Sequence, residues 1–182
     1  MKKLRFLLFC ISISLFSTQA FAQLPQDYTA IIKTNVLIFK DIQQWALLIE
    51  TNTKKPKQTN NYTIGYNQLS DDRTGYYASY ARRFYFPFLF EQLYFFGSPY
   101  GKVIYRDVNS DGFWYFGGPR FQSASISAGG NLGIQAIQFK RMSIEFLTGI
   151  GLGVVCWKQK YSGDALPVHL DGQLMINLGY MF

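Results

Sequence analysis

Cysteine is nearly absent from this chain of 182 residues, which has only Cys10 and Cys156. Cys10 lies in an N-terminal segment that we expect to be removed, so the mature protein has no internal disulfide and no cysteine-based metal cluster. Histidine is equally scarce. The single histidine, His169, is not part of a His-x-Ser pair, and nucleophilic catalysis therefore has little support. We expect His169 to be a solvated loop residue.

Long apolar runs are also missing from most of the chain. After residue 22 no segment offers about 18 consecutive apolar residues, which excludes a helical membrane protein. A membrane-spanning mature chain would have to be a closed β-barrel, because only helices and closed barrels satisfy the backbone in lipid.

The first 22 residues have the three parts of a signal peptide. Residues 1–5 are basic, residues 6–16 are apolar but too short to cross a bilayer, and Ala20 and Ala22 form an A-x-A site. Lipidation at Cys10 fits less well because Cys10 lies inside the apolar run. We therefore predict a signal peptide over 1–22 and an exported domain over 23–182.

Charge gives little indication of a nucleic-acid partner. Three cations leave with the signal peptide, so 18 − 3 = 15 positive charges remain against 11 negative ones, a net +4. Cations and aromatic residues do not interleave in one basic patch, and we expect no nucleic-acid partner. Asp164 and Asp171 lack the spaced third carboxylate of a calcium site, and we expect no metal and no cofactor.

What the mature chain does have is alternation of apolar and polar residues, which is typical of β-strands. In 173–182, Leu174, Ile176, Leu178, Tyr180 and Phe182 form one apolar row. Seven earlier segments show the same rhythm. The eight predicted strands are 28–39, 44–52, 62–67, 75–86, 93–106, 123–136, 142–154 and 173–182.

The polar face of these strands is rich in Ser, Gly, Asn and Gln and poor in charge. A water-exposed face would normally carry many lysines and glutamates, whereas small neutral side chains suit the interior of a narrow barrel. The glycines at 149, 151 and 153 follow strand spacing, which predicts small residues facing a crowded lumen and not a phosphate loop. Cys156 is expected on the lipid face.

Four charged residues fall on the predicted inner face near one end. If the strands run up and down from a periplasmic N-terminus, Lys33, Glu50, Arg83 and Glu145 all point inward near the periplasmic side. Because an isolated ion is costly in a medium of low dielectric, we predict that they pair and plug this half of the barrel. The alternative is that each charge reaches solvent.

The connections support the same orientation. The turn at 139–142 falls on the periplasmic side, and longer loops are expected outside around Ser70, Ser110 and Asp164, as in membrane barrels. The polar turn at 53–60 is longer than ideal. Phenylalanines between 84 and 96 predict an aromatic girdle, and Pro99 predicts a bulge or a bend.

With these residues in view, the chain resembles the small eight-stranded outer-membrane barrels of the OmpX and OmpA transmembrane type. It is more similar still to an uncharacterised family of outer-membrane barrels whose function is unknown. The residues that carry the likeness are 30–37, the Arg-Arg-Phe-Tyr-Phe run at 82–86, 149–154 and the terminal 179–182. The resemblance implies that Tyr180 and Phe182 are the signal read by the barrel assembly machinery.

We predict an all-β, eight-stranded antiparallel up-and-down transmembrane barrel in the outer membrane, monomeric and in contact with lipid. Its expected role is non-enzymatic, either structural or in recognition through outer loops. The best contact candidates are Phe113, Trp114, Tyr115 and Phe116. The first alternative is a soluble periplasmic lipocalin-like barrel that binds a small apolar ligand. The second is a lipid-modifying enzyme.

Overall fold

The computed structural model describes residues 28–36, 38–39, 42–55, 57–70, 73–87, 93–108, 120–138, 141–162 and 168–182. The predicted signal peptide and the four aromatic tip residues at 113–116 lie outside this set. The described part of the chain contains no helix long and apolar enough to cross a membrane.

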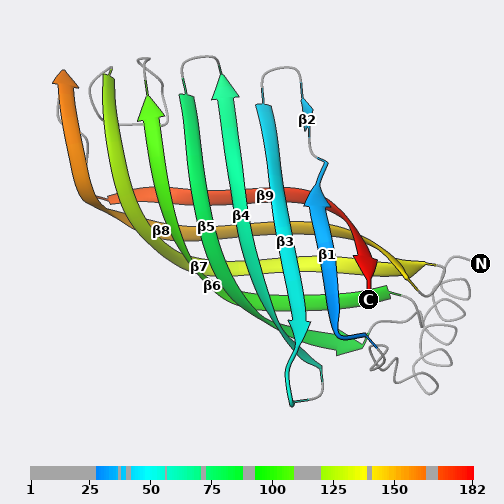
Figure 1. Ribbon diagram of the computed structural model, residues 1–182. Helices are drawn as coiled ribbons and strands as arrows, with labels where there is room; N and C mark the ends of the chain where they lie inside the picture. Colours follow the sequence, from blue (N-terminus) through cyan, green and yellow to red (C-terminus); the bar gives the residue numbers. More distant parts are fainter. Residues whose placement is uncertain are drawn as a thin grey trace, which may run out of the picture.

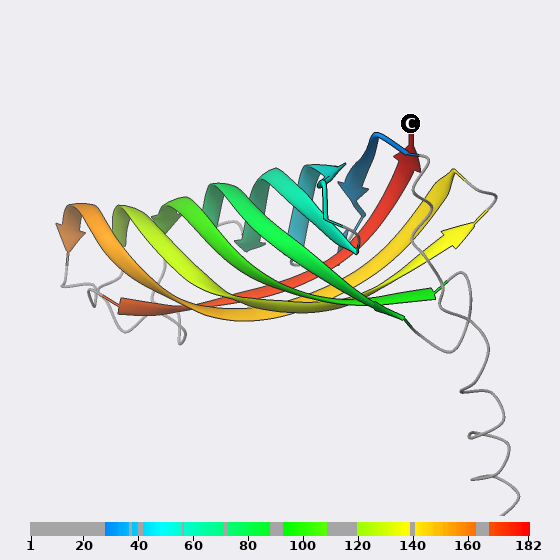
Figure 2. The same ribbon diagram turned by 90° about the horizontal axis from the view of Figure 1, so that it is seen from below.

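The described residues form one antiparallel sheet, which Figures 1 and 2 show curling round on itself. Its order is β1-β9-β8-β7-β6-β5-β4-β3-β2, and β1 also pairs with β3. The strands are β1 (Ala30–Asn35), β2 (Ile38–Phe39), β3 (Ile42–Asn52), β4 (Gln58–Ser70), β5 (Arg73–Pro87), β6 (Leu93–Val108), β7 (Arg120–Gln138), β8 (Met142–Ser162) and β9 (Val168–Met181).

Closure of the sheet depends on β1, which has a partner on each side. Ile31 pairs with Glu50 of β3 and with Met181 of β9. The short β2 continues β1 along β3 in the same register, since Ile38 faces Gln43. β1 and β2 are therefore two parts of one barrel strand, and the molecule is an eight-stranded antiparallel up-and-down barrel, as predicted.

Both ends of the described chain lie at the same end of the barrel. The Thr29 amide donates to the Phe182 carbonyl at 2.7 Å, and in Figure 1 the C-terminus lies beside β1. The β3–β4, β5–β6 and β7–β8 connections are at this end as well, because the strands alternate in direction. We call it the terminal rim and the opposite end the distal end.

The faces of the strands are those that the alternation predicts. On β7, Ser123, Ser125, Ser127 and Gln135 are buried in the lumen, whereas Ile126, Leu132 and Ile134 are exposed on the outside. β8 repeats the pattern, with Glu145 inside and Ile150 outside. Cys156 is exposed at a register shift between β7 and β8.

Several strand ends were predicted too short. β4 runs to Ser70 and β5 begins at Arg73, so the expected outer loop around Ser70 is wrong. The turn after β3 ends at Lys57, shorter than predicted, because Gln58 already belongs to β4. Polar residues at these strand ends still form backbone hydrogen bonds with the neighbouring strand. The hydropathy of a sequence does not predict such bonds.

Of the bulge or bend predicted at Pro99, the bulge is not formed, whereas β6 is curved along its length (Figure 1). The β5–β6 ladder lacks pairs beside Pro99, but Ala81↔Tyr100 and Phe84↔Gly97 keep one register. The proline removes one backbone donor, and the β6–β7 ladder is unbroken through Pro99.

The aromatic run at 84–96 divides between the two faces. Tyr85, Tyr94 and Phe96 are buried in the lumen, and Tyr85 packs 5.4 Å from Phe96. Phe86 is exposed on the outside, with Phe95 at 6.3 Å between ring centroids. Only the outer members lie on the face where a girdle would have to be.

The glycines of β8 make room for large side chains inside the barrel. A Cβ on Gly151 would meet the Tyr100 hydroxyl, and one on Gly153 would meet the His169 ring. The predicted crowded lumen is confirmed at both positions.

Candidate functional site

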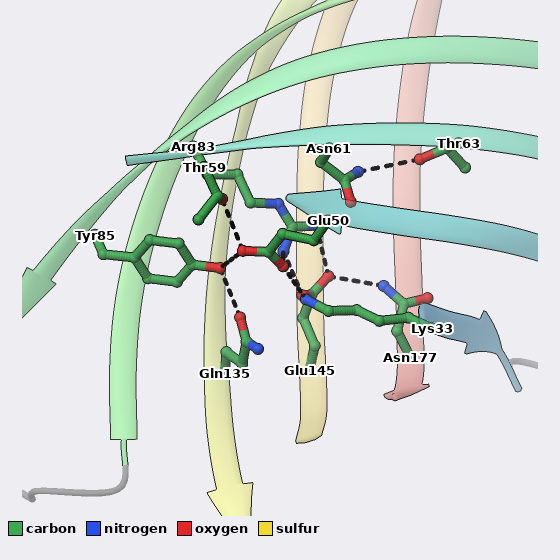
Figure 3. A network of polar contacts seen from close by, with 10 residues as sticks. All are labelled: Lys33, Glu50, Thr59, Asn61, Thr63, Arg83, Tyr85, Gln135, Glu145 and Asn177. Atoms are coloured by element: carbon green, nitrogen blue, oxygen red, sulfur yellow. Dashed lines mark hydrogen bonds and ion pairs between the residues drawn. The ribbon is translucent and has the colours of Figure 1, made fainter. Parts of the chain in front are cut away.

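Four buried charged residues from four strands meet inside the barrel near the terminal rim (Figure 3). Lys33 comes from β1, Glu50 from β3, Arg83 from β5 and Glu145 from β8. Each lies at an inward-pointing position of its strand, and all four side chains have no solvent exposure. We call them the charge quartet.

Lys33 bridges the two carboxylates of the quartet. Its Nζ donates to Glu50 Oε2 and to Glu145 Oε2, each at 2.5 Å. Gly179 of β9 allows this approach, because a Cβ there would lie 2.7 Å from the Lys33 stem.

Arg83 makes a second bridge between the same carboxylates. Nη1 donates to Glu145 Oε2 at 2.5 Å and to Glu50 Oε2 at 3.0 Å, and Nη2 donates to Glu145 Oε1 at 3.0 Å. The guanidinium also lies 4.4 Å from the centre of the Phe96 ring. The fork of the guanidinium matches a carboxylate in two places, which fixes Arg83 firmly.

Neutral polar side chains complete the shell of the quartet. Thr59 donates to Glu50 Oε1 at 2.7 Å, and Tyr85 Oη lies 2.5 Å from the same oxygen. Asn177 donates to Glu145 Oε1 at 2.8 Å. Both carboxylates are thus held by several donors, which is what a buried charge needs in order to remain ionised.

The quartet has two cations and two anions, so its net charge is zero. It contains no thiol or imidazole, and its carboxylates are fully engaged by donors. The arrangement can brace four strands against one another and obstruct the lumen.

A second polar cluster lies further toward the distal end, beyond the apolar layer of Leu147 and Met175. Lys102 Nζ is 2.7 Å from Asp171 Oδ1. Tyr100 and Ser127 donate to Asp171 Oδ2 at 3.0 and 2.8 Å.

Sequence reasoning missed this cluster because it assigned Asp171 to a loop. β9 begins at Val168, five residues before the predicted strand, and Asp171 is two residues from the inward Gln173. Extending the alternation back across Gly172 would have found Asp171 on the inner face. Val168 and Leu170, which are exposed on the outer face, continue the apolar row.

His169 also lies on β9, so its predicted place in a loop is wrong. Its half-buried ring is against Gly153, and neither ring nitrogen has a hydrogen-bond partner among the described residues. Ser127 donates to Asp171 and not to His169. The bond between nucleophile and base that a catalytic triad requires is therefore not formed in the described part of the barrel.

The two C-terminal aromatic residues lie on the outer face at the terminal rim. Tyr180 and Phe182 are exposed, and their rings meet edge to face at 5.0 Å. The Phe182 amide donates to the Ala30 carbonyl at 2.9 Å, which ties the last residue to β1.

Metal-binding side chains do not gather anywhere in the described ranges: no group of three His, Cys, Asp or Glu residues occurs there. Asp164 lies outside these ranges, and Asp171 is engaged with Lys102.

Comparison with known proteins adds little. No family model matches the chain, and no curated protein matches it. Among solved structures, the backbone structure of the Yersinia pestis outer membrane protein Ail in a phospholipid bilayer nanodisc is similar to it. The match covers 86% of this chain and 100% of Ail, with 11% sequence identity and a TM-score of 0.48. At these values the likeness carries no inference about function.

Proposed function

We propose that the mature chain is an integral outer-membrane β-barrel with a closed lumen and a non-enzymatic role. The observation that carries this proposal is the polarity of the barrel, which is the reverse of a water-soluble protein. Its charged residues Lys33, Glu50, Arg83 and Glu145 are buried inside, while large apolar side chains cover the outside.

The outer apolar surface is too large and continuous to face water. Ile150 is 64% exposed and Leu170 is 68% exposed. Soluble monomers rarely expose contiguous apolar patches above a few hundred Å². Other exposed members of this band are Ile32, Leu47, Ile49, Ile64, Val103, Ile126, Leu132, Ile134, Ile144, Phe146, Leu152, Val154, Leu174, Ile176 and Leu178.

The height of the band fits a bilayer. On β8 the outward row runs from Met142 to Val154. At roughly 3.3 Å per residue and a strand tilt of about 40°, this row rises roughly 30 Å. The hydrocarbon core of a bilayer is about 30 Å thick.

Aromatic side chains lie on the outer face of β3, β4 and β5, on either side of Ile64. Toward the distal end, Tyr66 packs 6.4 Å from Trp45 and 5.1 Å from Tyr76. Toward the terminal rim, Tyr62 and Tyr80 pack at 5.4 Å.

The filled interior supports a barrel that is not a general porin. An eight-stranded barrel is just wide enough for side chains to fill it. Here the charge quartet and the Lys102–Asp171 cluster occupy two levels of that interior.

The lipocalin-like alternative needs an apolar interior and a polar exterior. The described exterior is apolar, and the described interior mixes ion pairs with apolar residues such as Leu147 and Met175, which favours the membrane barrel. The lipid-modifying enzyme is less well supported, because His169 makes no hydrogen bond to Ser127 or Asp171.

Within this proposal, the role in recognition belongs to the distal connections, including Phe113, Trp114, Tyr115 and Phe116. Phe182 and Tyr180 would be the signal for the barrel assembly machinery. Their exposure at the terminal rim, close to β1, leaves them accessible to such a partner.

Two measurements test the membrane barrel. The purified mature protein should migrate faster on an SDS gel before boiling than after it, because closed membrane barrels resist SDS. In cells it should stay with the membrane fraction after osmotic shock. Release by osmotic shock without detergent would contradict the proposal and favour the lipocalin-like alternative.

A further inference from the structure

Exposed cations gather at the terminal rim of the barrel. Lys54, Lys55 and Lys57 lie in the β3–β4 turn and are exposed. Arg82 is half-buried on the outer face of β5, and Arg141 is exposed in the β7–β8 turn. We call these five residues the cationic rim.

The described carboxylates lie elsewhere. Glu50 and Glu145 are inside the lumen with the charge quartet. Asp171 binds Lys102, and Asp107 accepts from Gln122 near the distal end. The cationic rim therefore has an excess of positive charge among the described residues.

The charges inside the described lumen balance one another. It holds three cations and three anions, Lys33, Arg83 and Lys102 against Glu50, Glu145 and Asp171. The lumen therefore does not offset the positive charge of the cationic rim.

Lys57 has a backbone conformation that is unfavourable for lysine. Its φ is 60°, the only positive value at a non-glycine residue in the described ranges. Glycine or asparagine adopts this left-handed conformation with less strain. The turn is firmly placed, since the Lys57 carbonyl accepts from the Tyr85 amide at 2.9 Å. The Lys57 side chain is exposed, so the turn presents its charge on the outside of the barrel.

The two arginines lie directly against the aromatic belt. Arg82 is two residues beyond the outward Tyr80, and its Nη2 donates to Gln58 at 2.9 Å. Arg141 donates to the Tyr180 hydroxyl at 3.0 Å. Tyrosines are enriched at the depth of lipid headgroups, so Arg141 beside Tyr180 at the terminal rim is placed to reach lipid phosphates if the barrel spans a membrane.

We infer that the cationic rim binds the phosphate groups of anionic phospholipids in the leaflet at the terminal end of the barrel. This inference rests on the proposed membrane location. Guanidinium groups suit phosphate because their donors match its oxygens in pairs. Each lysine or arginine near an anionic membrane surface contributes roughly fivefold in association.

Native mass spectrometry of the folded mature protein in neutral detergent micelles tests this inference. Equal amounts of dimyristoyl phosphatidylglycerol and dimyristoyl phosphatidylcholine are added, and the first bound lipid is counted by mass. We expect about fivefold or greater preference for phosphatidylglycerol. Raising the ammonium acetate concentration should reduce it, because salt screens exposed charges.

Three variants sharpen the test. Lys54→Gln with Lys55→Gln should lower the preference at least fivefold, whereas Lys158→Gln with Lys160→Gln near the distal end of β8 should leave it unchanged. Lys57→Gly should weaken phosphatidylglycerol binding while the melting temperature stays equal or rises. Loss of affinity with retained stability separates binding from folding.

The outcomes that overturn the inference are distinct. A protein that shows heat-modifiable migration but binds both lipids equally overturns the lipid inference alone. The same holds if both double variants lose the preference to the same extent. Binding of glycerol phosphate as strong as that of the diacyl lipid would assign the rim to a soluble phosphate compound. A protein that never becomes heat-modifiable overturns the membrane proposal and this inference together.

Discussion

Arg83 is the largest fully buried side chain in the described barrel, and both of its carboxylate partners are buried with it. Its neighbour Arg82 points to the other face and is half-buried. Of two adjacent arginines, one is therefore enclosed in the lumen and the other lies on the outer face. This difference arises because successive side chains of a strand point to opposite faces.

Replacing Arg83 should reveal how strongly the quartet holds the barrel. In Arg83→Met, Lys33 is the only cation left to pair with the two buried carboxylates. Because one negative charge is then uncompensated, we expect a loss of about 3–5 kcal/mol in the free energy of unfolding. Urea unfolding in micelles, followed by tryptophan fluorescence, measures this change.

Two variants serve as controls for Arg83. Arg82→Met should change the free energy of unfolding by less than about 1 kcal/mol, because the group is not enclosed. Arg83→Met combined with Glu145→Gln restores charge balance and should recover part of the loss. Equal effects of Arg82→Met and Arg83→Met would contradict the importance of the quartet.

Gly151 offers a second test at the residue scale. Gly151→Ala would place a methyl group against the Tyr100 hydroxyl and the Ala128 carbonyl. The backbone atom cannot move away cheaply, so we expect a loss of about 1–3 kcal/mol in the free energy of unfolding. Gly101→Ala is the matched control, since nothing lies within 4 Å of its added Cβ. A melting temperature that falls equally for both would show that the lumen is not tightly packed there.

At the scale of single strands, β8 tests the apolar band. Ile150 lies midway along the outward row from Met142 to Val154. Ile150→Arg should cost about 2–4 kcal/mol in lipid, the value expected for an arginine near the bilayer midplane. The readout is the folded fraction in lipid vesicles at increasing urea concentration. Gln159→Arg, near the distal end of the same strand, should cost less than about 1 kcal/mol.

β9 tests the assembly signal. Deletion of Phe182 removes an exposed ring from the terminal rim and two backbone hydrogen bonds, one from the Thr29 amide and one to the Ala30 carbonyl. Since the rest of β9 keeps its ladder to β8, we expect impaired insertion in cells and near-normal folding into vesicles without the assembly machinery. Normal insertion in cells would contradict the role of Phe182 as a signal, although not the barrel.

At the scale of the whole molecule, closure of the sheet creates an interior that must be filled. The quartet, the layer around Leu147 and Met175, and the Lys102–Asp171 cluster succeed one another along the axis. Because two of these levels are networks of ion pairs, we expect no steady conductance when the protein is inserted in a planar bilayer. Stable ohmic current steps would contradict a closed lumen. A porin in the same apparatus is the positive control.

Much of this fold could be predicted without coordinates. Alternation along 123–136 and 142–154 assigned the correct residues to each face, because the side-chain period of a strand does not depend on tertiary context. The same alternation placed Lys33, Glu50, Arg83 and Glu145 on the inner face.

Other features were set by pairing between strands. Ser70 and Gln58 belong to strands because neighbouring strands supply their ladder partners, and their polar side chains give no sign of this. Pro99 stays in register for the same reason. These strand ends are therefore decided by the pairing partner on another strand and not by the polarity of the residue itself.

Sequence by itself determined that the strands have one apolar and one polar face and that four charges share the polar one, since both follow from the order of residues along each strand. Only the tertiary structure decided which charges touch. The distances of 2.5–3.0 Å within the quartet depend on strand stagger around the barrel. The Lys102–Asp171 pair required the true start of β9. The offset of the strands along the barrel axis is fixed by closure of the sheet, where β1 pairs with both β3 and β9. No pattern within one strand predicts that contact.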